Sequence, residues 1–216
     1  MRSSKNSAAT FLGLLIFTSV KLASAQAVPG CGNLQSQGQF GPFDYYDPEA
    51  KGVSLSLVEG RHFTPEVEQL VRGKTSVSPI EDLDYTLRAF PNHPRALNAV
   101  ARWALQGGSF QTAMVPSADC YFRRAIAFRP EDAIARMLFG TYLWKRGKDS
   151  EAAIQYEEAF RLAPTSAEVN YNAGLFFLKQ GDLARAKKHA EVAYAGGYPL
   201  PGLRNKIAAA ESKAAR

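Results

Sequence analysis

Apolar residues recur at helical spacing in the middle of the chain. Over 133–145 they lie on one side of the segment, at Leu138, Leu143 and Trp144. This periodicity predicts an amphipathic helix, and the glycine-containing polar run that follows ends it. A second helix is predicted over 150–163, because Pro164 cannot continue it. The pattern therefore indicates a helical hairpin.

Small residues alternate with a large one in the predicted second helix. Ala152, Tyr156 and Ala159 follow one another at i, i+4 and i+7, which places one large side chain between two small ones on the same face. In the first helix, Gly140 leaves room for a close approach of the partner backbone. Such alternation lets antiparallel helices interdigitate at the density of a protein interior.

The hairpin pattern repeats with a period of 34 residues. Seven residues are identical to the residue 34 positions further on, namely Ala133, Gly140, Lys145, Gly147, Ala152, Glu157 and Ala159. The same offset extends backwards and relates Pro130 to Pro164, Ala118 to Ala152, Phe122 to Tyr156 and Ala125 to Ala159. Three consecutive copies are therefore predicted, and a fixed period of this length is typical of repeat arrays.

The middle copy, 133–166, resembles the tetratricopeptide repeat. It carries the residues typical of that family at the family's spacing, namely Phe139, Gly140, Leu143, Ala152, Tyr156, Ala159 and Pro164. The other copies depart from the pattern in places. The first has a longer turn at 107–117, and the last has Ala190 for a large residue and Tyr198 for a proline. Arg136 and Asn170 stand where an apolar residue is common.

The resemblance implies an all-α solenoid of about three and a half helical hairpins over 64–200. A degenerate hairpin precedes the first full copy, and Thr64 is predicted to cap its first helix. Residues 201–216 are predicted to form a C-terminal capping helix, because a solenoid needs a polar or atypical end. The chain is also similar to a group of exported bacterial proteins that join such repeats to an N-terminal Cys-Gly and Gly-Pro-Phe-Asp-Tyr segment, and whose biochemical role is undefined.

The first 25 residues have the pattern of a secretory signal peptide. A cationic start precedes about a dozen mostly apolar residues, and Ala23-Ser24-Ala25 provides the small residues of a cleavage site before Gln26. The apolar run is too short to span a bilayer. We therefore expect a periplasmic or secreted protein without an integral membrane segment after cleavage. An uncleaved anchor, or a lipoprotein attached at Cys31, are the alternatives.

Composition and charge exclude several classes of function. The chain has 216 residues, 46% hydrophobic and 21% charged, which suits one folded core. Half of the net charge of +6 comes from the leader, and acidic residues are interleaved with basic ones elsewhere. We therefore expect no nucleic-acid partner. The common catalytic and nucleotide-binding motifs are absent from the sequence, so we expect a non-enzymatic protein without a cofactor or a metal.

Cys31 and Cys120 are the two cysteines of the chain. They are too few for a disulfide-dense scaffold and do not form a metal knuckle. Because an exported chain meets oxidising conditions, we expect them to form a disulfide that closes a long loop, with two independent thiols as the alternative.

Residues 26–63 are predicted to form an irregular segment, because Gly, Gln and Asp make it turn-rich. A short extended piece is expected at 55–58. The aromatic residues of this segment are expected to cover the open end of the first hairpin, namely Phe40, Phe43, Tyr45 and Tyr46. The rival interpretation makes them a platform for a sugar or peptide.

In tetratricopeptide repeat proteins the first helices line a concave groove that binds partners. The positions that the resemblance carries over are Arg95, Asn98, Arg102, Met137, Thr141, Trp144, Lys145, Tyr171, Leu175, Leu178 and Lys179. This mixture of apolar and basic residues favours an extended peptide with apolar and acidic residues. Of the carboxylate clamp found in chaperone-binding relatives, Asn172 alone is present, so clamp binding is not expected.

Each of these positions also has a structural interpretation. Trp144 can be a packing residue, Arg95 and Arg102 a solvated stripe, and Lys145 and Lys179 cations that meet the helix dipole. The sequence does not decide between these interpretations and partner binding.

The function expected is that of an adaptor or assembly factor of the bacterial periplasm or cell envelope, which binds a protein or peptide. The alternative is a small-ligand binder or enzyme with a pocket between the N-terminal strap and the first hairpin, formed by Tyr45, Tyr46, His62 and His93. Two histidines without a third ligand do not favour zinc. A further possibility is a structural subunit that docks through the loop at 107–117. The oligomeric state and the identity of the partner stay open.

Overall fold

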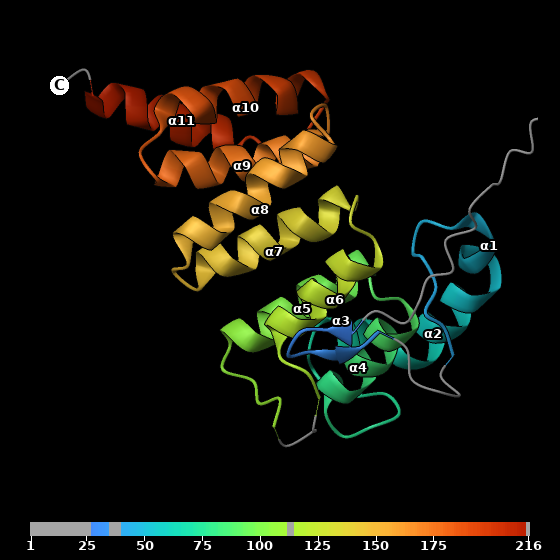
Figure 1. Cartoon of the computed structure of the whole chain (residues 1–216). Coiled ribbons are helices and arrows are strands. Elements are labelled where there is room, and N and C mark those ends of the chain that lie inside the picture. Colours follow the sequence, from blue (N-terminus) through green and yellow to red (C-terminus); the bar gives the residue numbers. More distant parts are fainter. Residues whose placement is uncertain (1–26, 35–39, 112–114, 215–216) are drawn as a thin grey trace, which may run out of the picture.

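The chain folds into a stack of antiparallel helical hairpins (Figure 1). The computed structural model describes residues 27–34, 40–111 and 115–214. Three helix pairs make up the stack: α5 (Pro94–Leu105) with α6 (Ala118–Phe128), α7 (Ala133–Lys145) with α8 (Asp149–Leu162), and α9 (Ala167–Lys179) with α10 (Leu183–Ala195). Before them lie the short α3 (Pro65–Glu68) and α4 (Pro79–Ala89), and α11 (Gly202–Ala214) closes the other end. The predicted all-α solenoid is confirmed.

The first helix of each repeat begins at a capping side chain. Asp132 ahead of α7 and Ser166 ahead of α9 each accept a hydrogen bond from the backbone N–H three residues further on. These bonds satisfy donors that the first turn of a helix leaves unpaired. After α7 and α9, Gly147 and Gly181 have φ angles of 74° and 80°, which glycine adopts without strain. The repeat therefore turns at the same place in both copies.

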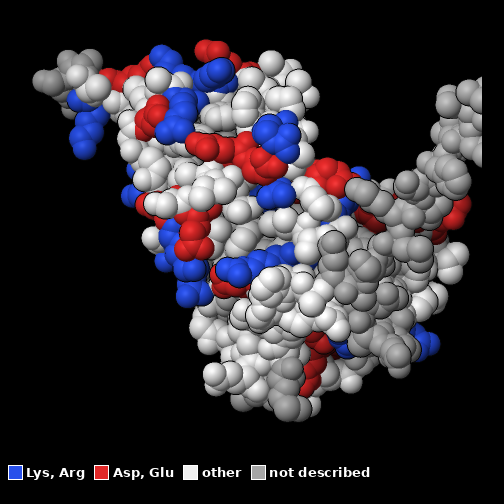
Figure 2. Space-filling model, viewed as in Figure 1, with Lys and Arg blue, Asp and Glu red and all other residues white. Residues whose placement is uncertain are grey.

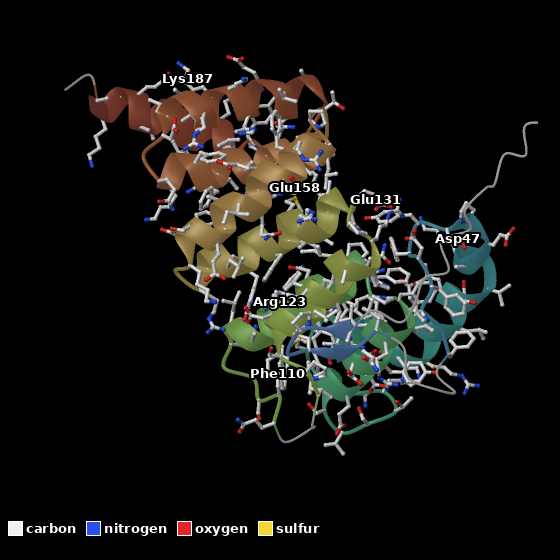
Figure 3. All side chains as sticks on the ribbon, in the orientation of Figure 1. Asp47, Phe110, Arg123, Glu131, Glu158 and Lys187 are labelled. Atoms are coloured by element: carbon white, nitrogen blue, oxygen red, sulfur yellow. A yellow bond between two sulfur atoms is a disulfide. The ribbon has the colours of Figure 1, made fainter. Side chains whose placement is uncertain are left out.

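An apolar core runs through the stack from α3 to α9. The ring of Tyr156 stacks on Phe176 with 4.9 Å between centroids, and Phe122 stacks on Phe139 at 5.0 Å. A Cβ atom at Gly140 would lie 3.2 Å from the ring of Tyr156, so glycine is what lets α7 and α8 approach closely here. Arg123 on α6, Glu158 on α8 and Lys187 on α10 mark successive levels of the stack (Figure 3).

Two polar residues that depart from the repeat pattern are held by hydrogen bonds. Asn170 is fully buried, and its amide nitrogen donates to the carbonyls of Pro164 and Ser166, each at 2.9 Å. Its Oδ1 lies 2.9 Å from Nδ1 of His189. Arg136 reaches a backbone carbonyl just ahead of α7. A buried polar group that keeps its partners avoids most of the desolvation cost.

The N-terminal segment is more helical than the sequence predicts. The helix α1 (Pro48–Ala50), the π-helical turn η1 (Lys51–Leu55) and α2 (Ser56–His62) follow without a break. The irregular conformation predicted over 26–63 is therefore wrong for this part, and so is the extended piece at 55–58. Asp47 starts the helical run, because its side chain accepts a hydrogen bond from the N–H of Glu49.

The π-helical turn explains why the pattern of this segment was misleading. Its apolar residues Ala50, Leu55 and Val58 are five and then three positions apart, which is not a regular helical period. The wider turn of a π-helix brings all three into one cluster with Phe90. The segment with α1 and α2 projects to one side of the stack (Figure 1).

Thr64 precedes α3 as expected, but its side chain makes no capping hydrogen bond. The helix is short, and Leu70 just after it has a φ of 64°, a left-handed conformation that is uncommon for leucine. The helix that pairs with α4 in the degenerate hairpin, α3, is therefore a single helical turn followed by a loop.

Acidic and basic side chains are interleaved over the repeat helices on the face shown in Figure 2. Within the described ranges, each helix is too short or too polar to cross a membrane. The leader expected at 1–25 lies outside the described residues.

Candidate functional site

An open cavity of about 620 Å³ lies along the first helices of the repeats. Its walls come from α5, α7, α9 and the N-terminal segment. The cavity, which we call the groove, is lined by Tyr45, Tyr46, Pro94, Arg95, Asn98, Ile134, Met137, Leu138, Thr141, Lys145, Glu168, Asn172 and Tyr198.

The helical period brings residues from one face of each helix into the groove. On α7, Met137, Thr141 and Lys145 are four positions apart, so they follow one another along the same side. Met137 is 1% exposed and forms part of the floor, while Lys145 is exposed at the rim. The hydroxyl of Thr141 is 2.8 Å from that of Tyr156, which ties the floor to the core.

The structure brings together about half of the residues predicted to bind a partner. The groove is lined by five of them, Arg95, Asn98, Met137, Thr141 and Lys145. Arg102 lines a small recess that Asn98 and Lys145 also border. These six residues therefore form one continuous surface on α5 and α7.

The other predicted positions lie outside the groove. Trp144 packs edge-on against Phe176 with 5.8 Å between ring centroids. Tyr171 stacks on Tyr198 at 4.1 Å and is 8% exposed. Leu175 and Leu178 pack against the apolar cluster that includes α11, and Lys179 is exposed on the last turn of α9. The C-terminal helix and its cluster thus occupy the surface that the third repeat was expected to offer.

Several lining residues were not among the predicted binding positions. Tyr45 and Tyr46 come from the N-terminal segment, which the sequence suggested only as a cover or platform. The other additions are Pro94, Ile134, Leu138, Glu168, Asn172 and Tyr198. A signal for Asn172 existed, because it matches one position of the carboxylate clamp. We call Tyr45 and Tyr46 the tyrosine wall. No periodic pattern connects 45–46 to the repeats, so the place of this wall in the groove could not be predicted.

Two of the three cations near the groove, Arg95 and Arg102, are held by other residues of the described chain. The Nε of Arg95 donates to Oε1 of Glu68 at 2.9 Å, and a second guanidinium nitrogen lies 3.6 Å from Glu59. The hydrogen bonds from Arg95 lower the pKa of Glu68. Arg102 donates to the backbone carbonyl of Glu68. Lys145, in contrast, forms no ion pair with any carboxylate of the described residues.

Hydrogen bonds fix the tyrosine wall to the repeats. The N–H of Tyr45 donates to Oδ1 of Asn92 at 2.9 Å, and Nδ2 of Asn92 donates to Asp44 at 2.8 Å. Arg129 on the other side of Asp44 donates at 2.5 Å. Burial opposes ionisation of Asp44, but the N–H of Tyr46 and the two side chains lower its pKa. The carboxylate thus anchors the segment through charge-assisted bonds.

A disulfide joins the N-terminal segment to the first repeat. Cys31 and Cys120 are bonded, with 5.2 Å between their Cα atoms, so the expected pairing is confirmed. Cys31 lies in the turn between β1 (Ala27–Val28) and β2 (Gly32–Asn33), which pair antiparallel. Arg124 on α6 donates to the carbonyl of Asn33 at 3.1 Å. The small hairpin is therefore held against α6 by a covalent and a polar contact.

The comparisons with known proteins agree with this architecture. The family model described as tetratricopeptide repeat matches residues 116–167 and 139–199. This part of the chain, 116–199, consists of tetratricopeptide repeats. Its repeats supply α6 to α10 within the matched ranges, and α5 completes the first hairpin.

A solved structure of PilF from Pseudomonas aeruginosa resembles this chain, with a TM-score of 0.52 and 23% sequence identity. The match covers 76% of this chain and 69% of that chain. At this identity the likeness concerns the fold. A search of curated proteins finds no significant match.

The residues of the alternative pocket do not converge on one point. Tyr45 and Tyr46 line the groove of the repeats. The ring of His93 is fully buried, 4.8 Å from that of Tyr45, and its Nε2 lies 3.1 Å from Glu59. His62 lines a different cavity, between α2 and α4. The predicted four-residue pocket is therefore wrong as a single site. The described residues also include no group of three potential metal ligands.

Proposed function

We propose that this protein is a non-enzymatic interaction module of the bacterial periplasm or cell envelope, and that it binds an extended segment of a partner protein in the groove. The observation that carries the proposal is the groove itself. It combines an apolar floor, the exposed amide of Asn98, the half-buried amide of Asn172 and one lysine that forms no ion pair with the described carboxylates. Repeats of this fold present such surfaces along their first helices.

The lining residues suggest the chemistry of the bound segment. Apolar side chains of the partner pack on Met137, Leu138 and Ile134, and an acidic side chain pairs with Lys145. The amides of Asn98 and Asn172 bond to the partner's main chain. Tyr45 and Tyr46 supply rigid apolar area at one end, and such residues often carry much of the binding energy.

The proposed location rests on separate observations. The leader pattern at 1–25 is that of a secreted protein, and a disulfide between Cys31 and Cys120 suits an oxidising compartment. Fractionation of cells that produce the full chain tests it. We expect the protein in the periplasmic or envelope fraction, with Gln26 as its first residue after cleavage.

The repeat provides a matched pair of variants to test the groove. Lys145 and Lys179 occupy equivalent positions in successive repeats, but only Lys145 lines the groove. A photo-crosslinking residue at Asn98 is used to capture a partner in the native envelope, and the purified partner is then titrated. We expect Lys145→Glu to weaken binding by about tenfold or more, because it replaces an attraction by a repulsion.

The variant Lys179→Glu introduces the same charge change outside the groove and should bind within about twofold of the wild type. Circular dichroism checks that both variants keep their helices. If both variants bind the captured partner like the wild type, the groove is not the binding site.

A further inference from the structure

A second cavity, of about 310 Å³, lies between α2 and α4 and shares no residue with the groove. The two helices contact each other beside the stack (Figure 1). The cavity, which we call the His62 cavity, is lined by Phe40, Leu57, Val58, Arg61, His62 and Tyr85. Its size is at the lower end of the range for small-molecule sites.

A buried carboxylate fixes the orientation of His62. The Nδ1 atom lies 2.8 Å from Oδ1 of Asp82, which is 1% exposed. Asp82 also accepts hydrogen bonds from the hydroxyls of Thr75 and Ser76 and from the backbone N–H groups of Lys74 and Thr75. Because these donors hold Asp82 as a carboxylate, Nδ1 of His62 carries the proton in the bond between them.

The opposite edge of the imidazole ring is left without a protein partner. The Nε2 atom of His62 has no hydrogen bond to any described residue, although its side chain is only 16% exposed. The ring stacks on Tyr85 with 3.8 Å between centroids, so it cannot turn to seek another partner. The Nε2 atom is therefore free to bind a ligand that enters the cavity.

The charges around the cavity favour an anion. Arg61, one residue before His62, forms no ion pair with the described carboxylates. The nearby acids are engaged elsewhere. Asp82 bonds to Nδ1 of His62, Asp84 pairs with Arg88 at 2.8 Å, and Glu59 faces His93. Leu57 and Phe40 are 53% and 41% exposed, and with Tyr85 they give the cavity an apolar wall.

We propose that the His62 cavity binds a carboxylate attached to a small aliphatic or aromatic group. The carboxylate lies between the protonated Nε2 of His62 and the guanidinium of Arg61, and the apolar group packs on Phe40, Leu57 and Tyr85. A free carboxylic acid and the C-terminal residue of a peptide share this chemistry.

The geometry favours binding over catalysis. No serine, threonine or cysteine of the described residues lines the cavity, and the hydroxyl of Thr75 lies on the Nδ1 side, 3.2 Å from that atom. A nucleophile activated by His62 would have to lie near Nε2. The cavity therefore has an anchor for a charged group, but no group to attack it.

The test titrates the purified, disulfide-bonded protein with 3-phenylpropionate and with N-acetyl-glycyl-phenylalanine, each as the acid and as the primary amide. The ring signals of the histidines are followed by NMR. We expect saturable binding of at least one acid, with a shift of the His62 signals, and binding of the amide weaker by about tenfold or more. Whether the free acid or the peptide acid binds better distinguishes the two sources of the carboxylate.

Two variants test the assigned residues. His62→Asn keeps a donor toward Asp82 and removes Nε2, and Arg61→Gln removes the exposed cation. Each should weaken binding of the acid by about tenfold or more, again because a charge-assisted bond is lost. Arg72→Gln, a change at another exposed arginine near α3, is the matched control and should leave binding unchanged. Arg61→Gln keeps the test decisive if His62→Asn fails to fold.

The proposal is overturned if neither acid binds saturably, if acid and amide bind equally, or if both variants bind like the wild type. The variant Lys145→Glu distinguishes ligand binding in the His62 cavity from partner binding in the groove. It should leave binding of the acid unchanged, whereas partner binding in the groove depends on Lys145.

Discussion

Asp82 organises the loop between α3 and α4. Its two oxygens accept hydrogen bonds from the side chains of Thr75 and Ser76, from main-chain N–H groups and from His62. The loop has little apolar burial of its own, and Val77 is 96% exposed. A single carboxylate therefore holds in place a segment that packing does not hold.

These bonds make stability depend on pH at the acidic end. Burial opposes ionisation of Asp82, but the hydrogen bonds from Thr75, His62 and the backbone lower its pKa from 3.8 to about 2. As the pH falls, Asp82 is protonated in the unfolded chain before it is protonated in the folded protein. The stabilisation is therefore complete above about pH 5 and is lost as the pH falls from about 4 to 2. It amounts to about 2 kcal/mol.

We expect Asp82→Asn to lower the free energy of unfolding by about 2 kcal/mol at pH 7, because the amide offers one acceptor and leaves donors of the loop unpaired. Urea denaturation at pH 7 and at pH 3 measures the change, which should be smaller at pH 3. The control is Glu81→Gln, at an exposed neighbouring carboxylate. A loss of the same size for Asp82→Asn and the control would contradict this role.

Single residues also show where the sequence was insufficient. The period of 34 makes Lys145 and Lys179 equivalent, yet one lines the groove and the other does not. Trp144 faces Phe176 in the next repeat, which residue type alone could not reveal. These differences depend on neighbours that are distant in the sequence, such as α11 and Tyr45.

At the scale of elements, the repeat helices were predictable and the N-terminal segment was not. The helix predicted from about 133 to 145 has those bounds, and that predicted over 150–163 spans Asp149–Leu162. Regular apolar periodicity and clear stop signals explain this agreement. The run from Pro48 to His62 contains a π-helical turn and Gly52 and Gly60, so its apolar residues follow no regular helical period.

The disulfide should contribute measurably to stability. Cys31 and Cys120 are 89 residues apart, and the chain-entropy model assigns about 4.6 kcal/mol to a loop of this length. We expect the double variant Cys31→Ser, Cys120→Ser to unfold at lower urea concentration, with a loss of about 2–4 kcal/mol. Hydrogen exchange should rise in β1 and β2, which then keep the hydrogen bond from Arg124 to Asn33 but lose the covalent link to α6.

Mass spectrometry after alkylation provides the check on this variant. The unreduced wild type should carry no label, and the reduced protein two. An unreduced protein with two labelled thiols, or a double variant as stable as the wild type, would contradict the proposed contribution of the disulfide.

For the whole molecule, the ends of the stack determine which surfaces stay open. At the C-terminal end, Leu203 of α11 is fully buried and lies so close to Gly174 that a Cβ atom there would come within 2.6 Å of it. Tyr171 and Ile207 belong to the same cluster. The helix predicted as a cap thus also covers part of the surface expected to bind a partner.

Removing the contact between Leu203 and Gly174 should loosen the C-terminal end of the repeat array first. We expect Leu203→Ala to cost about 2–5 kcal/mol, the usual range for a truncated core leucine. Because each repeat contacts mainly its neighbours, hydrogen exchange should increase in α9 to α11 and change little in α5 and α6. Lys206→Ala, on the exposed side of α11, is the control. A uniform increase along the chain would show that the array unfolds as one unit.

The two cysteines have a consequence for biosynthesis. A chain made from its N-terminus presents Cys31 long before Cys120, and no other cysteine lies between them. The thiol of Cys31 therefore meets no competing cysteine from the residues made before Cys120. Maturation of this protein should thus need an oxidant but no step that rearranges incorrect bridges.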